Sequence, residues 1–295
     1  MLLSLIRNVT DSYYIKGLYR GLWHFRHLFK AASDIYSVDG NYLMYLDSDH
    51  YYQWMMASTN YYGFGIRKLM RDFLRKGDIF IDVGGNIGYL SLLASMIVAE
   101  SGRVVAFEPD PRAAEVFQKN TALNNVHNIL LIEKACSDQD GSVLFNMASH
   151  LGWSTALTDT KTLKIEKQIN VEQCTLDGET GKLFGNESPR LIKIDVEGYE
   201  PYVLKGAHAI IDKNETAFII EINSERLGSC NHSILDLCGA FDRTKYRIYW
   251  IDEKRYLINS LNQVELVEIL KTEDFLYQNG DIFVVPVKFM SELQY

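Results

Sequence analysis

From Asp78 onward the chain alternates between apolar runs typical of strands and segments with the apolar spacing of helices. The strand-like runs are nearly continuous in apolar residues, as in strands buried on both faces of a parallel sheet. Crossover helices between such strands cover both faces of the sheet. YRIYWID and GDIFVVPV, near the end, are expected to be paired closing strands. The alternation predicts an α/β fold with a doubly wound, mainly parallel sheet.

The first 75 residues have a different pattern. Residues 1–30 have helical apolar spacing and carry five basic residues against one acid, and Asp39-Gly40 indicates a hairpin. We therefore divide the chain into a helical and hairpin extension, residues 1–75, and a domain over residues 76–295 with a β-rich insertion near 141–175. The extension could cap an acceptor site. Residues 1–30 could instead pack on the core, contact an anionic membrane surface or form a dimer contact, which leaves the oligomeric state open.

Composition narrows the classes of partner. The net charge of −8 and the pI near 5.4 argue against a nucleic-acid partner. The four cysteines form no metal-ligand pattern, so we expect neither a zinc site nor a disulfide framework, and we expect a reducing compartment. Arg7 and Asn8 interrupt the apolar start, and no run has the length of a membrane span. The expected location is cytoplasmic, with membrane contact at most peripheral.

The turn after the first strand of the alternation, DVGGNIG, predicts a ligand site. Gly84, Gly85 and Gly88 allow close backbone approach, and the start of the next helix attracts a carboxylate or phosphate. Asp82 would repel a pyrophosphate but would pair with an ammonium group. S-adenosylmethionine is therefore favoured over NAD, and a dinucleotide-linked oxidoreductase is the weaker alternative. A tight turn without a ligand would also explain the glycines.

The ends of the second and third strands predict the rest of the cofactor site. Glu108 ends the second strand, where an acid accepts hydrogen bonds from both ribose hydroxyls. After the third strand, Ala135 and Cys136 are placed to contact an adenine ring, with Ser137 or Asp138 near its amino group. A plain loop explains this last segment almost equally well.

Acids at the ends of the next two strands predict the acceptor side. Asp195, Glu197, Glu221 and Asn223 should crowd one mouth of the pocket, where a carboxylate could act as general base toward a hydroxyl. Asp195, Glu221 and Asn223 could instead bind a hard cation such as Mg²⁺. Of Asp195 and Glu197, one carboxylate could face the cofactor while the other caps the next helix. His150 is a further candidate base.

Aromatic segments are the remaining candidates for acceptor contacts. Trp153 could stack on a sugar, and HYYQWMM with NYYGFG could form a lid. A surface position for His150 and core packing for the aromatic side chains explain the same residues without an acceptor.

Five segments carry a resemblance: GDIFIDVGGNIGYLSL, VVAFEPDP, EKACSDQDGSVLF, VEQCTLD and LIKIDVEGYEPYVLKGA followed by FIIEIN. In this order and spacing, about residues 76–223, the chain resembles FkbM-type methyltransferases. The resemblance implies a class I methyltransferase fold, Rossmann-like with a seven-stranded sheet, and S-adenosylmethionine as cofactor. Gly85 stands where alanine is usual, which should loosen the turn. The residues carried over are Asp82, Gly84, Asn86 and Gly88 for the cofactor loop, Glu108 for ribose, and Asp195 and Glu197 for the acidic motif.

Members of this family commonly methylate hydroxyl oxygens on sugars or natural products. The resemblance therefore implies an S-adenosylmethionine-dependent O-methyltransferase for a sugar, glycan or other small-molecule acceptor. The alternative is a catalytically silent cofactor-binding module that serves as a membrane-peripheral or partner scaffold. The intact acids after the fourth and fifth strands argue against that alternative.

Overall fold

The computed structural model describes His24 and residues 34–38, 41–58, 62–157, 164–254, 263–269 and 278–293. The helices predicted within residues 1–30, and the membrane contact considered for them, lie outside the described residues apart from His24. None of the helices in the described ranges combines the length and the apolarity needed to cross a bilayer.

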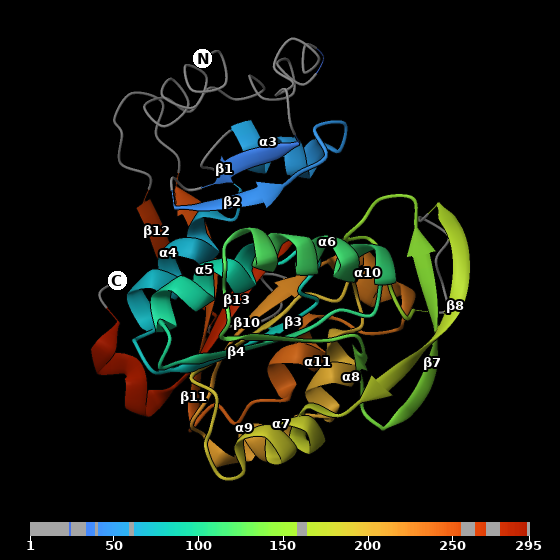
Figure 1. The fold of residues 1–295 in the computed structure, drawn as a ribbon. Coiled ribbons are helices and arrows are strands. Elements are labelled where there is room, and N and C mark those ends of the chain that lie inside the picture. Colours follow the sequence, from blue (N-terminus) through green and yellow to red (C-terminus); the bar gives the residue numbers. More distant parts are fainter. Residues whose placement is uncertain are drawn as a thin grey trace.

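The centre of the molecule is one eight-stranded sheet (Figure 1). Five neighbouring strands, from β10 to β5, are parallel, while β13 is antiparallel to both of its neighbours and β12 is antiparallel to β11. The paired closing strands are thus β11 and β13. In spatial order the strands are β12 (Gln263–Glu268), β11 (Tyr246–Lys254), β13 (Gly280–Pro286), β10 (Ala217–Ile222), β9 (Leu191–Ile194), β3 (Ile79–Val83), β4 (Arg103–Phe107) and β5 (Ile129–Ile132).

The prediction of seven strands was wrong by one, because β12 adds an edge to the mixed sheet. An edge strand pairs on one side only, here with β11. Its sequence, QVELVE, intersperses glutamine and two glutamates with valine and leucine. It lacks the continuous apolar run by which the buried strands were recognised, since an edge strand need not be apolar on both faces.

Helices cover both faces of the sheet (Figure 1). On β3, Ile81 and Val83 belong to one core cluster and Phe80 to the other, because successive side chains point to opposite faces. Burial of each such side chain contributes about 1.5–3 kcal/mol. One face carries α4 (Phe64–Phe73), α5 (Tyr89–Val98) and α6 (Pro111–Leu123), and the other carries α7 (Leu176–Phe184), α8 (Glu200–Lys205), α9 (His208–Lys213), α10 (Ser224–Ser229) and α11 (Ile234–Gly239).

The N-terminal segment includes the predicted hairpin, with β1 (Ile35–Val38) antiparallel to β2 (Tyr42–Tyr45). The hairpin docks on α6, where Asn120 accepts a hydrogen bond from the Tyr45 amide at 2.7 Å and Asn124 one from the Leu43 amide at 2.8 Å. Helix α3 (Tyr51–Ser58) follows. Helix α4, although it precedes residue 76, packs its apolar stripe into the core of the main sheet.

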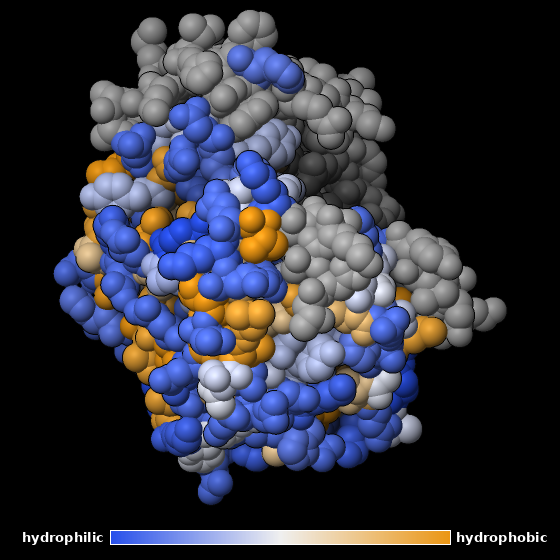
Figure 2. Space-filling view, turned by 90° about the vertical axis from the view of Figure 1, so that its right-hand side faces the viewer, coloured by the Kyte–Doolittle hydropathy of each residue, from blue (hydrophilic) through white to orange (hydrophobic). Residues whose placement is uncertain are grey.

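The β-rich insertion is a three-stranded sheet in the order β6-β8-β7. Its strands are β6 (Ala135–Cys136), β7 (Gly141–Ala148) and β8 (Ile165–Cys174). The β7–β8 ribbon extends beside the main sheet (Figure 1), and hydrophilic and apolar residues are interspersed on this side of the molecule (Figure 2). The short strand β6 connects the insertion to the carboxyl end of β5, which it follows after two residues.

Candidate active site

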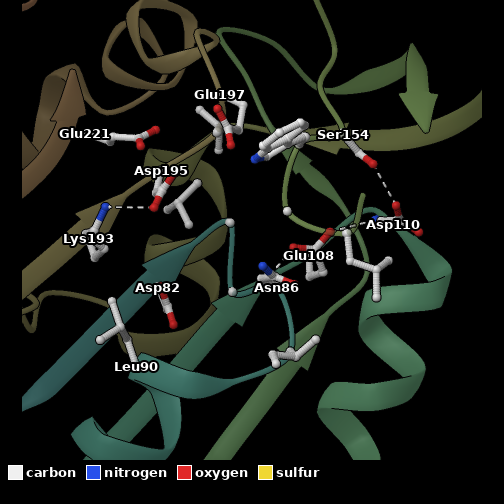
Figure 3. A pocket seen from close by; sticks show the side chains of 18 of the residues that line it. Asp82, Asn86, Leu90, Glu108, Asp110, Ser154, Lys193, Asp195, Glu197 and Glu221 are labelled. Carbon is white, nitrogen blue, oxygen red and sulfur yellow. Dashed lines mark hydrogen bonds and ion pairs between the residues drawn. The ribbon is translucent and has the colours of Figure 1, made fainter. Parts of the chain in front are cut away.

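A cavity of about 540 Å³ opens at the carboxyl ends of β3, β4, β9 and β10. This is the edge of a doubly wound sheet at which ligands bind. Figure 3 shows side chains that line the cavity, with the acids Asp195, Glu197 and Glu221 on one side and Glu108 with Asn86 on the other. The sites predicted for cofactor and acceptor therefore share one cavity.

The glycine turn is held against two neighbouring strands. The amides of Gly84 and Gly85 both donate to the Phe107 carbonyl, at 2.9 and 3.0 Å. Gly84 has φ +85°, and a β-carbon there would lie 1.9 Å from the Asp195 carbonyl oxygen, so only glycine fits. Gly88 also has a positive φ, +87°, and forms the N-cap of α5; it is not among the described residues that line the cavity.

Gly85 lines the cavity but does not loosen the turn. A β-carbon at this position would lie 3.1 Å from the Phe117 ring and 3.2 Å from the Ala106 β-carbon. The space that an alanine methyl would fill is therefore taken by the Phe117 ring, which also packs on Gly88. Phe117 of α6 therefore packs tightly against the turn, and the absence of a methyl group at Gly85 leaves no gap.

Asp82 lines the floor of the cavity and is 2% exposed. Its carboxylate accepts a hydrogen bond from the Ser91 hydroxyl at 2.5 Å. Burial raises the pKa of Asp82 to about 6, although the Ser91 bond and the Lys193 charge oppose the shift. The side chain is therefore mostly ionised at neutral pH. The pairing with an ammonium group stays a prediction.

Glu108 is fixed by two backbone amides. One carboxylate oxygen accepts from Asn86 and the other from Asp110, each at 2.8 Å, and the side chain is 7% exposed. Burial raises the pKa of Glu108 to about 8. Each oxygen keeps a lone pair for a ligand hydroxyl, which fits the ribose role.

At pH 9, where the Glu108 carboxyl is ionised, we expect Glu108→Gln to weaken S-adenosylmethionine binding by about 10–100-fold, because each hydrogen bond to a charged group contributes about 1.5–3 kcal/mol. The raised pKa sets the pH dependence. The carboxyl is protonated below about 8 and accepts from two hydroxyls only when ionised. Wild-type affinity should therefore rise relative to the variant as pH increases through 8, as measured by calorimetry. Glu133→Gln, an exposed acid after β5, is the matched control. Equal affinities of Glu108→Gln and wild type would show that Glu108 does not bind ribose.

The adenine end is only partly as predicted. Ala135 and Cys136 line the cavity, but Ser137 does not; its hydroxyl lies 3.2 Å from the hydroxyl of Tyr199, which does. Phe145 of β7 completes this apolar wall and was missed by sequence reasoning. Its signal, an aromatic residue within the strand-like run GSVLFNM, does not distinguish a pocket residue from a core residue.

On the acceptor side, carboxylate oxygens of Asp195, Glu197 and Glu221 lie within 4.8 Å of one another. Burial of its carboxyl and the Asp195 and Glu197 charges raise the pKa of Glu221 well above its ordinary value. Burial acts in the same sense on Asp195, but the Lys193 ammonium and a hydrogen bond from Glu221 hold the pKa of Asp195 below its ordinary value. Of these two neighbouring carboxyls, Asp195 is therefore the stronger acid and Glu221 binds a proton more tightly.

Lys193 was missed by sequence reasoning. It is 1% exposed, and its ammonium lies 3.2 Å from Asp195 (Figure 3). The same ammonium lies 3.5 Å from Asp281. The lysine in the otherwise apolar run RLIKIDV is the signal that could have revealed it, because a buried lysine needs a charged partner. The three carboxylates have the atom types of a divalent cation site, but Lys193 already supplies a positive charge there, and we assign no ion.

The chain turns sharply between Asp195 and Glu200. Glu197 has φ +57° and Gly198 has φ +98°, which brings Glu197 into the cavity beside Asp195. Glu197 pairs with Arg226 at 3.1 Å. The fully buried Glu200 braces the turn by accepting from the amides of Val196 and Gly198, each at 3.1 Å. Glu200 therefore takes the capping role that the sequence had suggested for Asp195 or Glu197.

His150 is exposed and does not line the cavity. Its ring lies 5.2 Å from that of His50, which does, and 5.0 Å from that of Trp153. Tyr52 also lines the cavity, with Trp153 6.3 Å away. His50 was missed; its signal was its place at the start of the aromatic segment HYYQWMM.

Residues 82–248 match the Methyltransferase FkbM domain, more than half of the chain. "Methyltransferase 1" of Beauveria bassiana is 28% identical over 142 residues, 43% of this chain and 57% of that protein. "Hexuronic acid methyltransferase AglP" of Haloferax volcanii is 27% identical over 139 residues, 47% of this chain and 54% of that protein. The matches thus span about half the length of these curated relatives. The structure of the FkbM methyltransferase of Methylobacillus flagellatus aligns with 70% of this chain and 43% of its own, at 17% identity and a TM-score of 0.42.

The described residues fit S-adenosylmethionine. The glycine turn lets the ligand approach the backbone, Glu108 offers two acceptor oxygens to ribose, and an apolar wall lies where adenine belongs. Asp82 supplies a buried negative charge for an ammonium group. The chain belongs to the FkbM methyltransferase domain family, and its methyl donor is S-adenosylmethionine.

Proposed function

We propose that the protein transfers a methyl group from S-adenosylmethionine to a hydroxyl oxygen of a sugar, glycan or other small-molecule acceptor. The observation that carries this proposal is the carboxylate cluster of Asp195, Glu197 and Glu221 beside the cofactor turn. A hydroxyl needs a proton acceptor as it becomes an ether oxygen. Carboxylates with raised proton affinity suit that task near neutral pH.

When bound, the donor supplies a sulfonium methyl group, so that its C–S bond breaks as the new C–O bond forms. The ionised Asp195–Glu221 pair takes the hydroxyl proton, and Lys193 balances the negative charge of the pair at 3.2 Å from Asp195. Because the sulfonium is already activated, positioning of the acceptor supplies much of the rate. The left-handed backbone at Glu197, followed by the positive φ of Gly198, directs Glu197 into the cavity beside Asp195.

Two observations support a sugar or glycan acceptor. One curated relative is named a hexuronic acid methyltransferase. In addition, the aromatic rings of Tyr52, Tyr62 and Trp153 line the same cavity as the carboxylates. Aromatic faces beside acids are a suitable surface for a sugar, whose ring offers C–H faces and hydroxyl edges.

The test uses calorimetry for the donor and methyl-labelled S-adenosylmethionine for the reaction. We expect the donor and its demethylated product to bind, and the label to appear on oxygen in an acceptor panel that pairs each hexoside with its amino-sugar analogue. Label on nitrogen alone would contradict O-methylation. Failure of either ligand to bind would contradict the whole assignment.

A further inference from the structure

One wall of the cavity comes from residues outside the matched family domain. His50, Tyr52 and Tyr62 precede residue 82, and they line the cavity together with Trp153. The rings form a continuous group, with 6.2 Å between His50 and Tyr52, 5.9 Å between Tyr52 and Tyr62, and 6.3 Å between Tyr52 and Trp153. None of these residues was assigned to the cofactor above.

The wall is tied to the core on both sides. The hairpin before it is clamped to α6 by Asn120 and Asn124. On the other side, the Arg226 guanidinium that pairs with Glu197 also donates to the Trp153 carbonyl at 3.4 Å. The wall is therefore held facing the acids. Burial raises the pKa of Tyr52, and the Glu197 and Glu221 charges add to the shift, as expected for a hydroxyl close to those carboxylates.

The wall offers groups for a ligand. Tyr52 is 38% exposed and lines the cavity, so part of its ring is accessible. Both ring nitrogens of His50 are buried and have no hydrogen-bond partner among the described residues. A buried polar atom without a partner costs free energy that a bound hydroxyl would recover. Burial lowers the pKa of His50, and His150 adds to the effect, so the ring is neutral and one nitrogen can accept.

The charges of the cavity disfavour an anionic acceptor. Each cationic side chain among the described lining residues already has an acidic partner. Lys193 is paired with Asp195 and Asp281, Arg226 with Glu197, and Lys134 with Glu172. A carboxylate on the acceptor would approach the three clustered acids without an unpaired cation to receive it.

We propose that His50, Tyr52 and Trp153 form the acceptor subsite and that it selects an uncharged, ring-shaped polyol, such as a neutral hexoside, over a hexuronic acid. This inference rests on the proposed function and assigns its specificity. The ring stacks on Tyr52 or Trp153, one hydroxyl points to the Asp195–Glu221 pair, and a second hydroxyl bonds to His50. His50 is a binding residue here, and the base is the carboxylate pair.

The test measures binding to the protein saturated with S-adenosylhomocysteine. The probes are methyl glycosides of glucose, galactose and mannose, each with its uronic acid counterpart. We expect at least one neutral glycoside to bind about tenfold or more tightly than its uronate, because the uronate carboxylate would lose its hydration beside the acids without an unpaired cation to compensate. Tyr52→Ala and His50→Phe should each weaken that binding by about tenfold, the effect of one lost contact of about 1.4 kcal/mol. His50→Gln, which keeps a hydrogen-bonding group, should recover part of it.

Tyr45→Ala is the matched control, because Tyr45 is 36% exposed on β2 and does not line the cavity. In turnover assays, His50→Phe should raise KM and leave kcat nearly unchanged. Tighter binding of the uronates, no binding of any hexoside, or wild-type binding by both subsite variants would overturn the subsite proposal. Neutral hexosides that bind without being methylated would instead contradict the proposed function and leave the subsite standing.

Discussion

Glu221→Gln is expected to lower kcat by about 10²–10⁴-fold, the usual contribution of a positioned acid or base. The amide has nearly the same shape, so the fold and donor affinity should be retained. Burial and the neighbouring charges of Asp195 and Glu197 raise the pKa of Glu221, so the fully ionised pair becomes more populated as pH rises. Wild-type kcat/KM should therefore increase with pH across the neutral range, and the variant should lose that dependence. Steady-state rates with a saturating donor, measured from pH 6 to 9, test both points.

Glu225→Gln is the matched control for this experiment, because Glu225 is exposed in the first turn of α10 and does not line the cavity. It should behave like the wild type at every pH. A Glu221→Gln enzyme with undiminished kcat would remove Glu221 from the chemistry. Loss of activity with an unchanged pH profile would assign the titrating group to another residue.

Gly84→Ala should destabilise the protein by about 3 kcal/mol or more and abolish donor binding. The added β-carbon would lie 1.9 Å from the Asp195 carbonyl oxygen, and the residue has φ +85°. Strain of this kind costs about 1–3 kcal/mol for the backbone alone, before the clash is relieved. Relief would require the turn to move away from the end of β9, which would displace Gly85 and Asn86, two residues that line the cavity. Denaturant unfolding and calorimetry with S-adenosylhomocysteine measure the two effects.

Gly181→Ala provides the comparison, since Gly181 lies inside α7 with no atom within 4 Å of an added β-carbon. Alanine is favoured over glycine in a helix by about 1 kcal/mol, so this variant should be as stable as the wild type or more stable. If Gly84→Ala unfolds at the wild-type denaturant concentration and still binds the ligand, the turn is not constrained as the structure indicates.

The sequence-based predictions succeeded where a residue's role follows from local spacing. A run such as IFIDV predicts a strand buried on both faces, and the end of that strand places DVGGNIG and Glu108 at the edge where ligands bind. The carboxylates at the ends of β9 and β10 follow by the same reasoning. The sequence did not predict which of these carboxylates faces the cavity and which caps the turn. That distinction depends on the turn at Glu197 and Gly198 and on Glu200 behind it.

The predictions failed, or made no statement, where a role depends on a distant partner. Ser137 is adjacent in sequence to a cavity residue, yet its hydroxyl faces Tyr199. His150 is exposed, while His50, far from it in sequence, lines the cavity beside it. β12 was missed because its strand character comes from pairing with β11.

The sequence by itself determined the family, the parallel α/β core and the position of the glycine turn at the cavity, because strand periodicity and glycine conformation act over a few neighbouring residues. Only the tertiary structure decided the charge state and shape of the acceptor side. Lys193 holds Asp195 ionised through contacts that also involve Asp281, and α6 clamps the hairpin that leads to His50 and Tyr52. The physical reason is that electrostatic pairing and packing depend on distance in space, which the folded chain sets between segments far apart in sequence.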